Sequence, residues 1–228
     1  MQLFYNPILE NCTLSKEESS HCSKVMRKNI GDYITVFDGV GNACNAKITS
    51  IKNTVNYQIL TKNYFKKNKN IVRIAVAPPK TANRFDFMIE KLVELGVDEI
   101  ILLKTENSER TNINEGRLMK TIIAACKQSI NYHLPKVSIN KSIAETLLSK
   151  GDKLMCYCGI DQSKYLLTQL AINNEVCIYI GPEGDFSPSE VDHFLINKGK
   201  LISLGEQRLR TETAAIAATS ILFSMLLK

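Results

Sequence analysis

From residue 70 to the end of the chain, short apolar runs of strand length alternate with longer segments that carry apolar residues at helical spacing. The strands that we predict cover 71–76, 99–103, 153–157, 176–180 and 200–204. Helices are predicted near 84–95, 115–130, 163–171 and 188–197, with a last one over about 212–227. Strands that alternate with helices are typical of an α/β layer. We therefore expect this larger part of the chain to form one α/β domain.

The first third of the chain has a different pattern, in which short runs alternate between apolar and polar residues. These runs cover 33–37, 43–51 and 55–60. Turn-forming pairs at Asp38-Gly39 and Lys52-Asn53 separate them, which predicts a small antiparallel β-barrel or sandwich. The polar run 66–70 then follows the last strand pattern and precedes a new apolar strand, as a linker between two cores does.

One helix is expected inside this first domain, and it carries part of an uneven charge distribution. Ser15 precedes an acidic first turn, whereas Lys24, Arg27 and Lys28 gather at the other end, which matches the helix dipole. The net charge of the chain is +6. Residues 1–70 hold ten Lys and Arg against five Asp and Glu, and the remainder holds nineteen against eighteen. Nearly all of the excess positive charge therefore lies in the first domain.

Composition excludes several classes of protein. With 44% hydrophobic and 23% charged residues, the chain has enough apolar sequence for a folded core. Seven cysteines without a C-x-x-C pair and three scattered histidines predict no metal site, and the dispersed cysteines indicate a reducing cytosol. The first seven residues lack the features of a secretory signal. The apolar stretch 214–227 is shorter than the roughly 20 residues of a membrane span, so we expect a buried helix and no membrane partner.

The clearest local signal is the turn after the strand 176–180, with the sequence Gly-Pro-Glu-Gly-Asp-Phe-Ser-Pro-Ser-Glu over residues 181–190. Ser187 is placed as the N-cap of a helix, with Pro188 at the first helical position and Glu190 placed to complete a capping box. The turn then lies at the carboxyl edge of the sheet, where open α/β sheets bind ligands. The alternative is a plain strand-to-helix turn that needs glycine for a positive φ.

A second glycine turn follows the strand 200–204 at Gly205. The two turns, at adjacent strand ends, are candidates for facing walls of one pocket. Neither contains a phosphate-binding loop, and the dinucleotide fingerprint G-x-G-x-x-G is absent from the chain, which favours a ligand without phosphates. Thr211 or Thr213 is a candidate cap of the last helix, for which a purely structural buried helix is the alternative interpretation.

Several segments together resemble the RsmE family of 16S rRNA uridine methyltransferases. They are 21–27 (HCSKVMR), 90–97 (EKLVELGV), 108–110 (SER), 181–187 (GPEGDFS), 203–205 (SLG) and 209–214 (LRTETA). They occur in the order of the family and span almost the whole chain, which makes the match far more specific than any one motif. The resemblance implies an amino-terminal PUA-like β-barrel over 1–69 and a carboxyl-terminal SPOUT α/β domain with a trefoil knot over 70–228.

The resemblance also implies a cytoplasmic homodimer that uses S-adenosylmethionine to methylate N3 of uridine 1498 in 16S rRNA of the small ribosomal subunit. The residues it marks for the methyl donor are Gly181, Glu183, Gly184, Leu204, Gly205, Leu209 and Thr211. Arg210 is the candidate catalytic residue, because a guanidinium just before a helix start gains nothing from the helix dipole and needs another partner, such as an RNA phosphate or a uracil oxygen. An exposed loop arginine is the alternative.

The predicted RNA contacts are Lys24, Arg27, Lys28 and Arg110. Glu183 and Glu212 are open candidates for a general base, or for a role facing the sulfonium or capping the loops. The chain departs from the family pattern at Gln2, Cys22, Lys127, Asn131 and Asp185. Two alternative functions follow: a non-catalytic RNA-binding ribosome assembly factor, and a SPOUT methyltransferase that acts on another RNA position.

Overall fold

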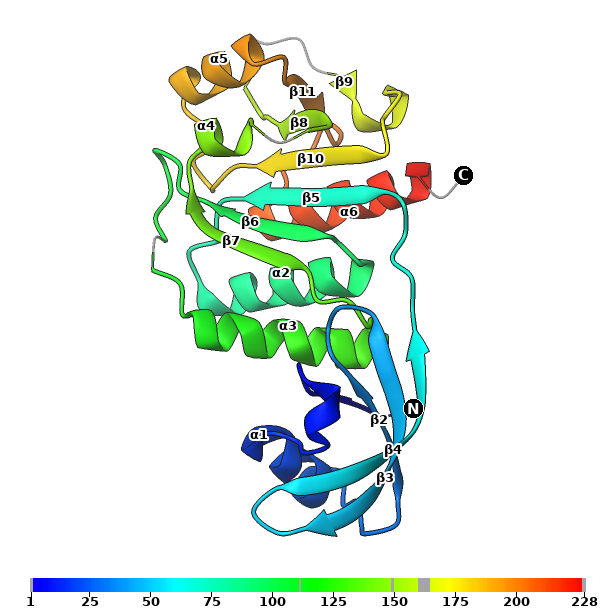
Figure 1. Ribbon diagram of the computed structural model, residues 1–228. Coiled ribbons are helices and arrows are strands. Elements are labelled where there is room, and N and C mark those ends of the chain that lie inside the picture. The colour runs from blue at the N-terminus through cyan, green and yellow to red at the C-terminus, as the bar shows by residue number, and fades with distance from the viewer. Residues whose placement is uncertain (1, 111, 149, 160–164, 227–228) are drawn as a thin grey trace. The chain divides into compact units, whose positions relative to one another are not determined.

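The computed structural model describes residues 2–110, 112–148, 150–159 and 165–226, which fall into two compact units (Figure 1). The first unit contains the chain up to Lys67 together with Ile123–Leu134, and the second contains 68–122 and the residues from Pro135 onward. Ile123–Leu134, which include the end of a helix, thus pack with the first unit. The sequence pattern did not indicate this. The proposed domain boundary after residue 69 stays a prediction.

The first unit is built on one four-stranded sheet. Its strands, in sheet order, are β1 (Leu3–Tyr5), β2 (Tyr33–Phe37), β3 (Asn42–Ile51) and β4 (Val55–Tyr64). The pairs β2–β3 and β3–β4 are antiparallel as expected, whereas β1 runs parallel to β2. Side chains that alternate along the strands, among them Phe4, Val36, Ile48 and Tyr57, fill the core of this unit.

The predicted helix of the first unit is present as α1 (Lys16–Ser20), which continues into a wider helical turn over His21–Val25. Ser15 is its N-cap, because the Ser15 hydroxyl accepts a hydrogen bond of 3.2 Å from the Glu18 amide. A short 3₁₀ helix, Leu9–Asn11, lies between β1 and α1.

The second unit is a parallel α/β sheet of seven strands in the order β7-β6-β5-β10-β8-β11-β9. Their bounds are β5 Ile71–Val76, β6 Glu99–Leu103, β7 Lys136–Lys141, β8 Asp152–Cys156, β9 Tyr165–Leu166, β10 Glu175–Ile180 and β11 Lys200–Ser203. All of the neighbouring pairs are parallel, so their carboxyl ends share one edge. The α/β class predicted from the sequence is confirmed.

Helices cover both faces of this sheet (Figure 1). They are α2 Ala82–Leu95, α3 Glu115–Ser129, α4 Ile143–Thr146, α5 Pro188–Ile196 and α6 Thr211–Leu226, with a 3₁₀ turn at Leu167–Gln169. On one face α2 packs against α6. On the other face α4 and α5 cover a core that includes Tyr179 and Phe194, whose rings meet edge to face at 4.9 Å. Within the described residues, no helix is long and apolar enough to cross a membrane.

Two elements of the second unit differ from the sequence analysis. The helix predicted over 163–171 is wrong where the chain is described: Tyr165–Leu166 pair with β11 as an edge strand, and a single 3₁₀ turn follows. Residues 163 and 164 lie outside the described residues. The short apolar run Tyr-Leu-Leu fits either class, and pairing with a free sheet edge decides it. The strand β7 was not predicted, because its apolar residues are few and Asn140 interrupts it with a φ of 55°.

Candidate functional site

Three loops meet at the carboxyl edge of the parallel sheet. They follow β8, β10 and β11, and their described residues are 157–159, 181–186 and 204–210. β8 lies between β10 and β11, so the two glycine turns do not follow adjacent strands as the sequence suggested. The loop after β8 fills that gap and becomes the third member of the site.

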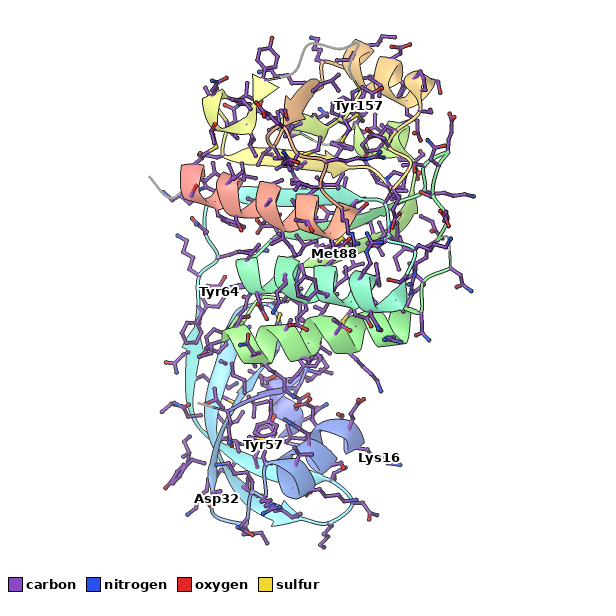
Figure 2. The ribbon with its side chains drawn as sticks, turned by 180° about the vertical axis from the view of Figure 1, so that it is seen from behind. Lys16, Asp32, Tyr57, Tyr64, Met88 and Tyr157 are labelled. Atoms are coloured by element: carbon purple, nitrogen blue, oxygen red, sulfur yellow. The ribbon has the colours of Figure 1, made fainter. Side chains whose placement is uncertain are left out.

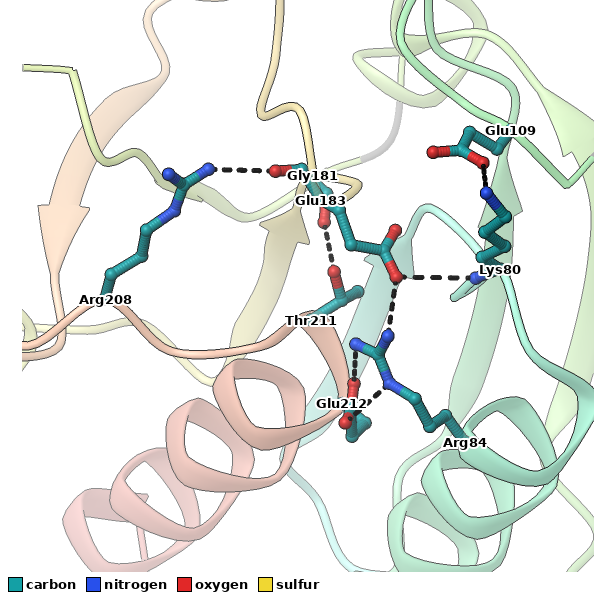
Figure 3. Close-up of polar contacts among 8 residues, drawn as sticks. All are labelled: Lys80, Arg84, Glu109, Gly181, Glu183, Arg208, Thr211 and Glu212. Carbon is teal, nitrogen blue, oxygen red and sulfur yellow. Dashed lines mark hydrogen bonds and ion pairs between the residues drawn. The ribbon is translucent and has the colours of Figure 1, made fainter.

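The loops after β10 and β11 are tied together through main-chain oxygens (Figure 3). The Arg208 guanidinium donates a hydrogen bond of 2.9 Å to the carbonyl oxygen of Glu183. The Thr211 hydroxyl donates one of 3.0 Å to the carbonyl oxygen of Gly181. Thr211 is therefore not the cap of the last helix; it is the first residue of α6, and its side chain fixes that helix to the β10 loop.

The loop after β8 is held to the β10 loop by Asp185. The Cys158 amide donates a hydrogen bond of 2.9 Å to one Asp185 carboxylate oxygen, and the Phe186 amide donates one of 2.9 Å to the other. Asp185 has a φ of 61°, in the left-handed region, where Asp is tolerated better than most residues. At this position, where the chain departs from the family pattern, Asp185 joins two of the three loops.

A cavity of about 260 Å³ lies between the loops after β8 and β11 and the start of α6. Its lining consists of Cys156, Tyr157, Cys158, Ile202, Ser203, Leu204, Gly205, Glu206, Gln207, Arg208, Leu209 and Ala214. Three of the predicted donor-binding residues, Leu204, Gly205 and Leu209, line it directly. The other four, Gly181, Glu183, Gly184 and Thr211, do not line this cavity, and they lie in the loop and helix start that support its wall.

Cys156, Tyr157 and Cys158 also line the cavity, and they were not among the residues predicted from the sequence. A signal for them was present, because the strand 153–157 was predicted and its carboxyl end had to share an edge with the other strand ends. The glycine turns, however, predicted site loops only after β10 and β11.

The two glycines of the site differ in what surrounds them. A Cβ at Gly184 would meet Asn107 at 3.2 Å, and Asn107 donates hydrogen bonds to the carbonyl oxygens of Gly184 and Asp185. A side chain at Gly184 would therefore press on the loop after β6, not fill the cavity. Gly205 has a φ of 136° and open space around its Cβ position, so it is needed for its backbone conformation.

Arg84, which was not predicted from the sequence as a site residue, forms ion pairs with two carboxylates next to the site. Arg84 of α2 donates to both carboxylate oxygens of Glu212 at 2.8 and 2.7 Å and to the Glu183 carboxylate at 2.9 Å (Figure 3). The Lys80 amide points to the same Glu183 oxygen at 3.5 Å, and the Lys80 ammonium pairs with Glu109 at 2.6 Å. One guanidinium thus connects α2, the β10 loop and α6.

This network decides the protonation of Glu212. Burial acts to raise the pKa of its carboxyl group, but the hydrogen bonds and charge of Arg84 outweigh burial and lower the pKa below its ordinary value. A general base needs a pKa near the working pH and a free oxygen. Glu212 has neither, because Arg84 engages both of its oxygens, whereas Glu183 uses only one carboxylate oxygen in the network.

Arg210 lies in the turn that leads into α6, and its carbonyl oxygen accepts the first helical hydrogen bond, from the Ala214 amide at 2.8 Å. Its side chain is exposed, and among the described residues no hydrogen bond or ion pair holds its guanidinium. The arginine beside it, Arg208, is in contrast fixed to the β10 loop. Of these two arginines, Arg210 is the one free to contact a second molecule.

Comparison with known proteins identifies the family of this chain. A family model for an RNA methyltransferase domain matches residues 66–223, and one for an RNA methyltransferase PUA domain matches residues 14–59. The chain is 31% identical to the ribosomal RNA small subunit methyltransferase E of Rickettsia conorii, over 90% of this chain and 86% of that protein. The chain belongs to the ribosomal RNA small subunit methyltransferase E family.

Solved structures support the same assignment. A structure from Porphyromonas gingivalis, described as a "probable rRNA-methyltransferase", superposes with a TM-score of 0.92 at 33% identity and covers 99% of this chain and 98% of that one. A methyltransferase from Legionella pneumophila, solved with the cofactor S-adenosylmethionine bound, has a TM-score of 0.85 at 26% identity, with 99% and 98% coverage. The expected methyltransferase E fold, with a small β domain before a parallel α/β domain, is confirmed.

The predicted RNA contacts of this methyltransferase E chain lie in both units. In the first unit, Lys24 and Arg27 are exposed and Lys28 is half-buried near the end of the α1 segment, where Arg27 has a φ of 51°. In the second unit, the Arg110 guanidinium lies over the Phe85 ring, 4.8 Å from its centroid. The Arg110 Nε is buried without a hydrogen-bond partner among the described residues. Contact of these four residues with RNA stays a prediction.

Two departures from the methyltransferase E pattern have a structural explanation. Lys127 pairs with Glu18 at 2.7 Å, and Glu18 also accepts a hydrogen bond of 3.1 Å from the Tyr5 amide. Cys22 is fully buried in the core of the first unit, where burial raises the pKa of its thiol to about 11. Both residues therefore stabilise the first unit.

Proposed function

We propose that this chain transfers a methyl group from S-adenosylmethionine to N3 of a uridine, at position 1498, in the 16S rRNA of the small ribosomal subunit. The observation that carries the proposal is the cavity between the loops after β8 and β11, supported by the β10 loop, in a chain of the methyltransferase E family. The expected reaction class, cofactor and RNA substrate all follow from that family.

The residues present fit the adenosine part of the donor. The cavity of about 260 Å³ is lined largely by main-chain turns and uncharged side chains, and among the described residues of the site no phosphate-binding loop occurs. Adenosine carries no charge and suits such a lining. Leu204, Gly205 and Leu209 would contact the donor directly. Gly181, Glu183, Gly184 and Thr211 would hold the wall in place.

S-adenosylmethionine, when bound, supplies an electrophilic methyl group on a positively charged sulfur. N3 of uracil carries a proton and is a poor nucleophile, so the protein has to favour its anionic form. The free guanidinium of Arg210 is suited to donate hydrogen bonds to a uracil oxygen on which negative charge develops. The loops supply the rest by holding the acceptor in line. Glu183 and Glu212 hold the loops through Arg84. Glu183 keeps its second carboxylate oxygen and stays the candidate acceptor of the N3 proton.

The remaining parts of the proposal concern the whole assembly. We expect a cytoplasmic homodimer, and α6 is the candidate contact because Ile216, Ile221 and Phe223 on it remain partly exposed. The basic first unit is proposed to hold rRNA through Lys24, Arg27 and Lys28, with Arg110 adding a contact from the second unit. The trefoil knot of the second unit is likewise a proposal from family membership.

The proposal is tested with small ribosomal subunits that lack the methyl group and with radiolabelled S-adenosylmethionine. We expect incorporation into 16S rRNA, and mass analysis of the digested nucleosides should give N3-methyluridine. A different methylated nucleoside would indicate a methyltransferase with another target. Binding without incorporation would indicate an assembly factor.

Replacement of Gly205 by valine should weaken donor binding at least about tenfold, or ~1.4 kcal/mol. A β-branched residue at a φ of 136° is strained, and strain of ~1–3 kcal/mol would shift the loop that lines the cavity. Calorimetric titration with S-adenosylmethionine measures the effect. Gly96→Val is the matched control, because Gly96 also has a positive φ and open surroundings but ends α2. Unchanged affinity in Gly205→Val would contradict the assignment.

The affinity for rRNA should fall steeply with salt if the first unit contacts phosphates. Replacing Lys24, Arg27 and Lys28 together by glutamine should make the slope of log K against log salt shallower by about 2 to 3. Filter binding at several salt concentrations measures the slope. Lys62→Gln is the control, because Lys62 already pairs with Glu10 at 2.7 Å. An unchanged slope in the triple variant would show that these three residues do not contact rRNA phosphates.

A further inference from the structure

The first unit has a hollow of about 550 Å³, apart from the cavity of the candidate site. It lies beside β2 and β3 of the four-stranded sheet, next to the start of β1. Its lining consists of Gln2, Lys28, Tyr33, Ile34, Thr35 and Asn45. The lining combines one exposed aromatic ring, two side-chain amides, a hydroxyl and an ammonium group, and contains no carboxylate.

Strand register explains why three of the lining residues, Tyr33, Thr35 and Asn45, share a face. Tyr33 pairs with Lys47 across the β2–β3 ladder, and Thr35 pairs with Asn45 two residues on. Ile34, between them, belongs to the core of this unit. Because side chains alternate along a strand, Tyr33, Thr35, Asn45 and Lys47 point to the outer face.

The aromatic ring is unusually open. Tyr33 is 66% exposed, although a tyrosine on a strand usually covers neighbouring apolar side chains. Within the described part of the chain, no ring contact covers it. One face of the ring is therefore available to a flat partner.

The amides beside the ring keep unused hydrogen-bonding capacity. The Asn45 carbonyl oxygen accepts a bond of 3.2 Å from the Thr35 hydroxyl, and its amide nitrogen donates one of 3.2 Å to the Thr61 hydroxyl. A primary amide has two donors and two acceptor positions, so Asn45 retains one of each. The Gln2 side chain has no hydrogen-bond partner among the described residues.

Charge around the hollow favours an anionic partner. Lys28 lines it, Lys47 lies across from Tyr33, and neither takes part in an ion pair within the described residues. The nearby carboxylate of Asp32 already accepts a hydrogen bond of 2.8 Å from the Asn29 amide. The first 70 residues carry an excess of five positive charges.

We propose that this hollow receives one unpaired nucleotide of the rRNA substrate, with the base stacked on Tyr33. Gln2 and Asn45 bind the edge of the base, and Lys28 contacts the adjoining phosphate. An exposed aromatic ring beside amides and a lysine is the combination by which proteins hold unpaired bases, since stacking, edge hydrogen bonds and phosphate contact are all supplied. The inference rests on the proposed function for the identity of the RNA.

The test measures binding of small ribosomal subunits that lack the methyl group to Tyr33→Ala and Tyr33→Phe. We expect Tyr33→Ala to raise the dissociation constant and the KM for the subunit about tenfold, with kcat and affinity for S-adenosylmethionine unchanged. Tyr33→Phe keeps the ring and should bind nearly as the original chain does. Thermal unfolding of each variant checks that the first unit is folded.

Tyr64→Ala is the matched control. Tyr64 is also 66% exposed, but it pairs with Asn42 near the other end of the sheet. Figure 2 shows Tyr64 at the opposite end of the first unit from Asp32, the residue before Tyr33. Equal affinity of Tyr33→Ala and the original chain would overturn the inference, as would equal losses in Tyr33→Ala and Tyr64→Ala.

The outcomes separate this inference from the proposed function. Absence of methyl transfer by the original chain would refute the proposed function, and the binding measurement with Tyr33→Ala would still decide whether the hollow holds RNA. If the original chain transfers the methyl group and Tyr33→Ala binds RNA fully, only the inference that the hollow binds a nucleotide would be refuted.

Discussion

Replacement of Arg210 by alanine should lower kcat for methyl transfer about 100-fold while the dissociation constant for S-adenosylmethionine stays nearly constant. A donor aimed at charge that develops in the transition state contributes about this much, ~10²–10³ in kcat. Because no described residue holds the Arg210 side chain, its removal should leave the loops in place. Single-turnover methylation and calorimetric titration measure the two quantities.

Arg208→Ala provides the comparison for Arg210→Ala. Arg208 donates a hydrogen bond to the Glu183 carbonyl oxygen, so its loss should loosen the cavity wall and weaken donor binding first. The two substitutions should therefore have different effects. Arg210→Ala should lower kcat, whereas Arg208→Ala should first weaken the binding of S-adenosylmethionine. Equal losses in kcat and donor affinity for Arg210→Ala would argue for a structural role of that residue.

Replacement of Arg84 by methionine should destabilise the protein by about 2 kcal/mol at neutral pH. The side chain of Glu212 is 9% exposed and would lose its two charged hydrogen bonds, while Glu183 would lose its ion pair. Removing one partner of a fully buried pair costs ~3–5 kcal/mol, and a surface pair is worth ~1 kcal/mol or less. The Arg84 side chain is 25% exposed, which places this pair between those limits. Denaturant unfolding measures the change.

The effect of Arg84→Met should depend on pH with a defined sign. In the original chain, Arg84 lowers the pKa of Glu212, so the pair stabilises the fold above the ordinary carboxyl pKa, and this contribution is lost as the pH falls through the lowered folded-state value. In the variant, burial is opposed only by a backbone hydrogen bond and the charge of Arg210, so the pKa of Glu212 is higher than in the original chain and protonation relieves the unpaired charge. The destabilisation should therefore be smaller at pH 4 than at pH 7.

Arg117→Ala is the control for Arg84→Met. Arg117 pairs with Asp86 at the surface, where its side chain is 56% exposed, so its loss should cost less than about 1 kcal/mol. A destabilisation by Arg84→Met as small as that of Arg117→Ala would show that the Arg84 network does not stabilise the fold.

The turn over residues 181–190 shows what could be predicted from the sequence. Its capping box is present as predicted, with the Ser187 hydroxyl accepting from the Glu190 amide and the Glu190 carboxylate accepting from the Ser187 amide. Pro188 is the first helical residue. These features depend on residues at most three positions apart, so the sequence contains all the information that they need.

The Arg84 network shows what could not be predicted. Its two carboxylates lie 99 and 128 residues away along the chain, and no local pattern links them to α2. The strand order was also hidden, since β8 separates the two strands whose turns were expected to be neighbours. Contacts that arise only when distant segments pack are set by topology, and the spacing of residues along a single chain does not specify topology.

Two of the ties that assemble the site end on carbonyl oxygens, those of Gly181 and Glu183. Every amino acid carries such an oxygen, so these two acceptors survive any substitution that leaves the local backbone unchanged. Alanine scanning would consequently detect the donors, Arg208 and Thr211, but not the residues whose carbonyl oxygens accept these hydrogen bonds. The site therefore contains more residues than alanine scanning would identify.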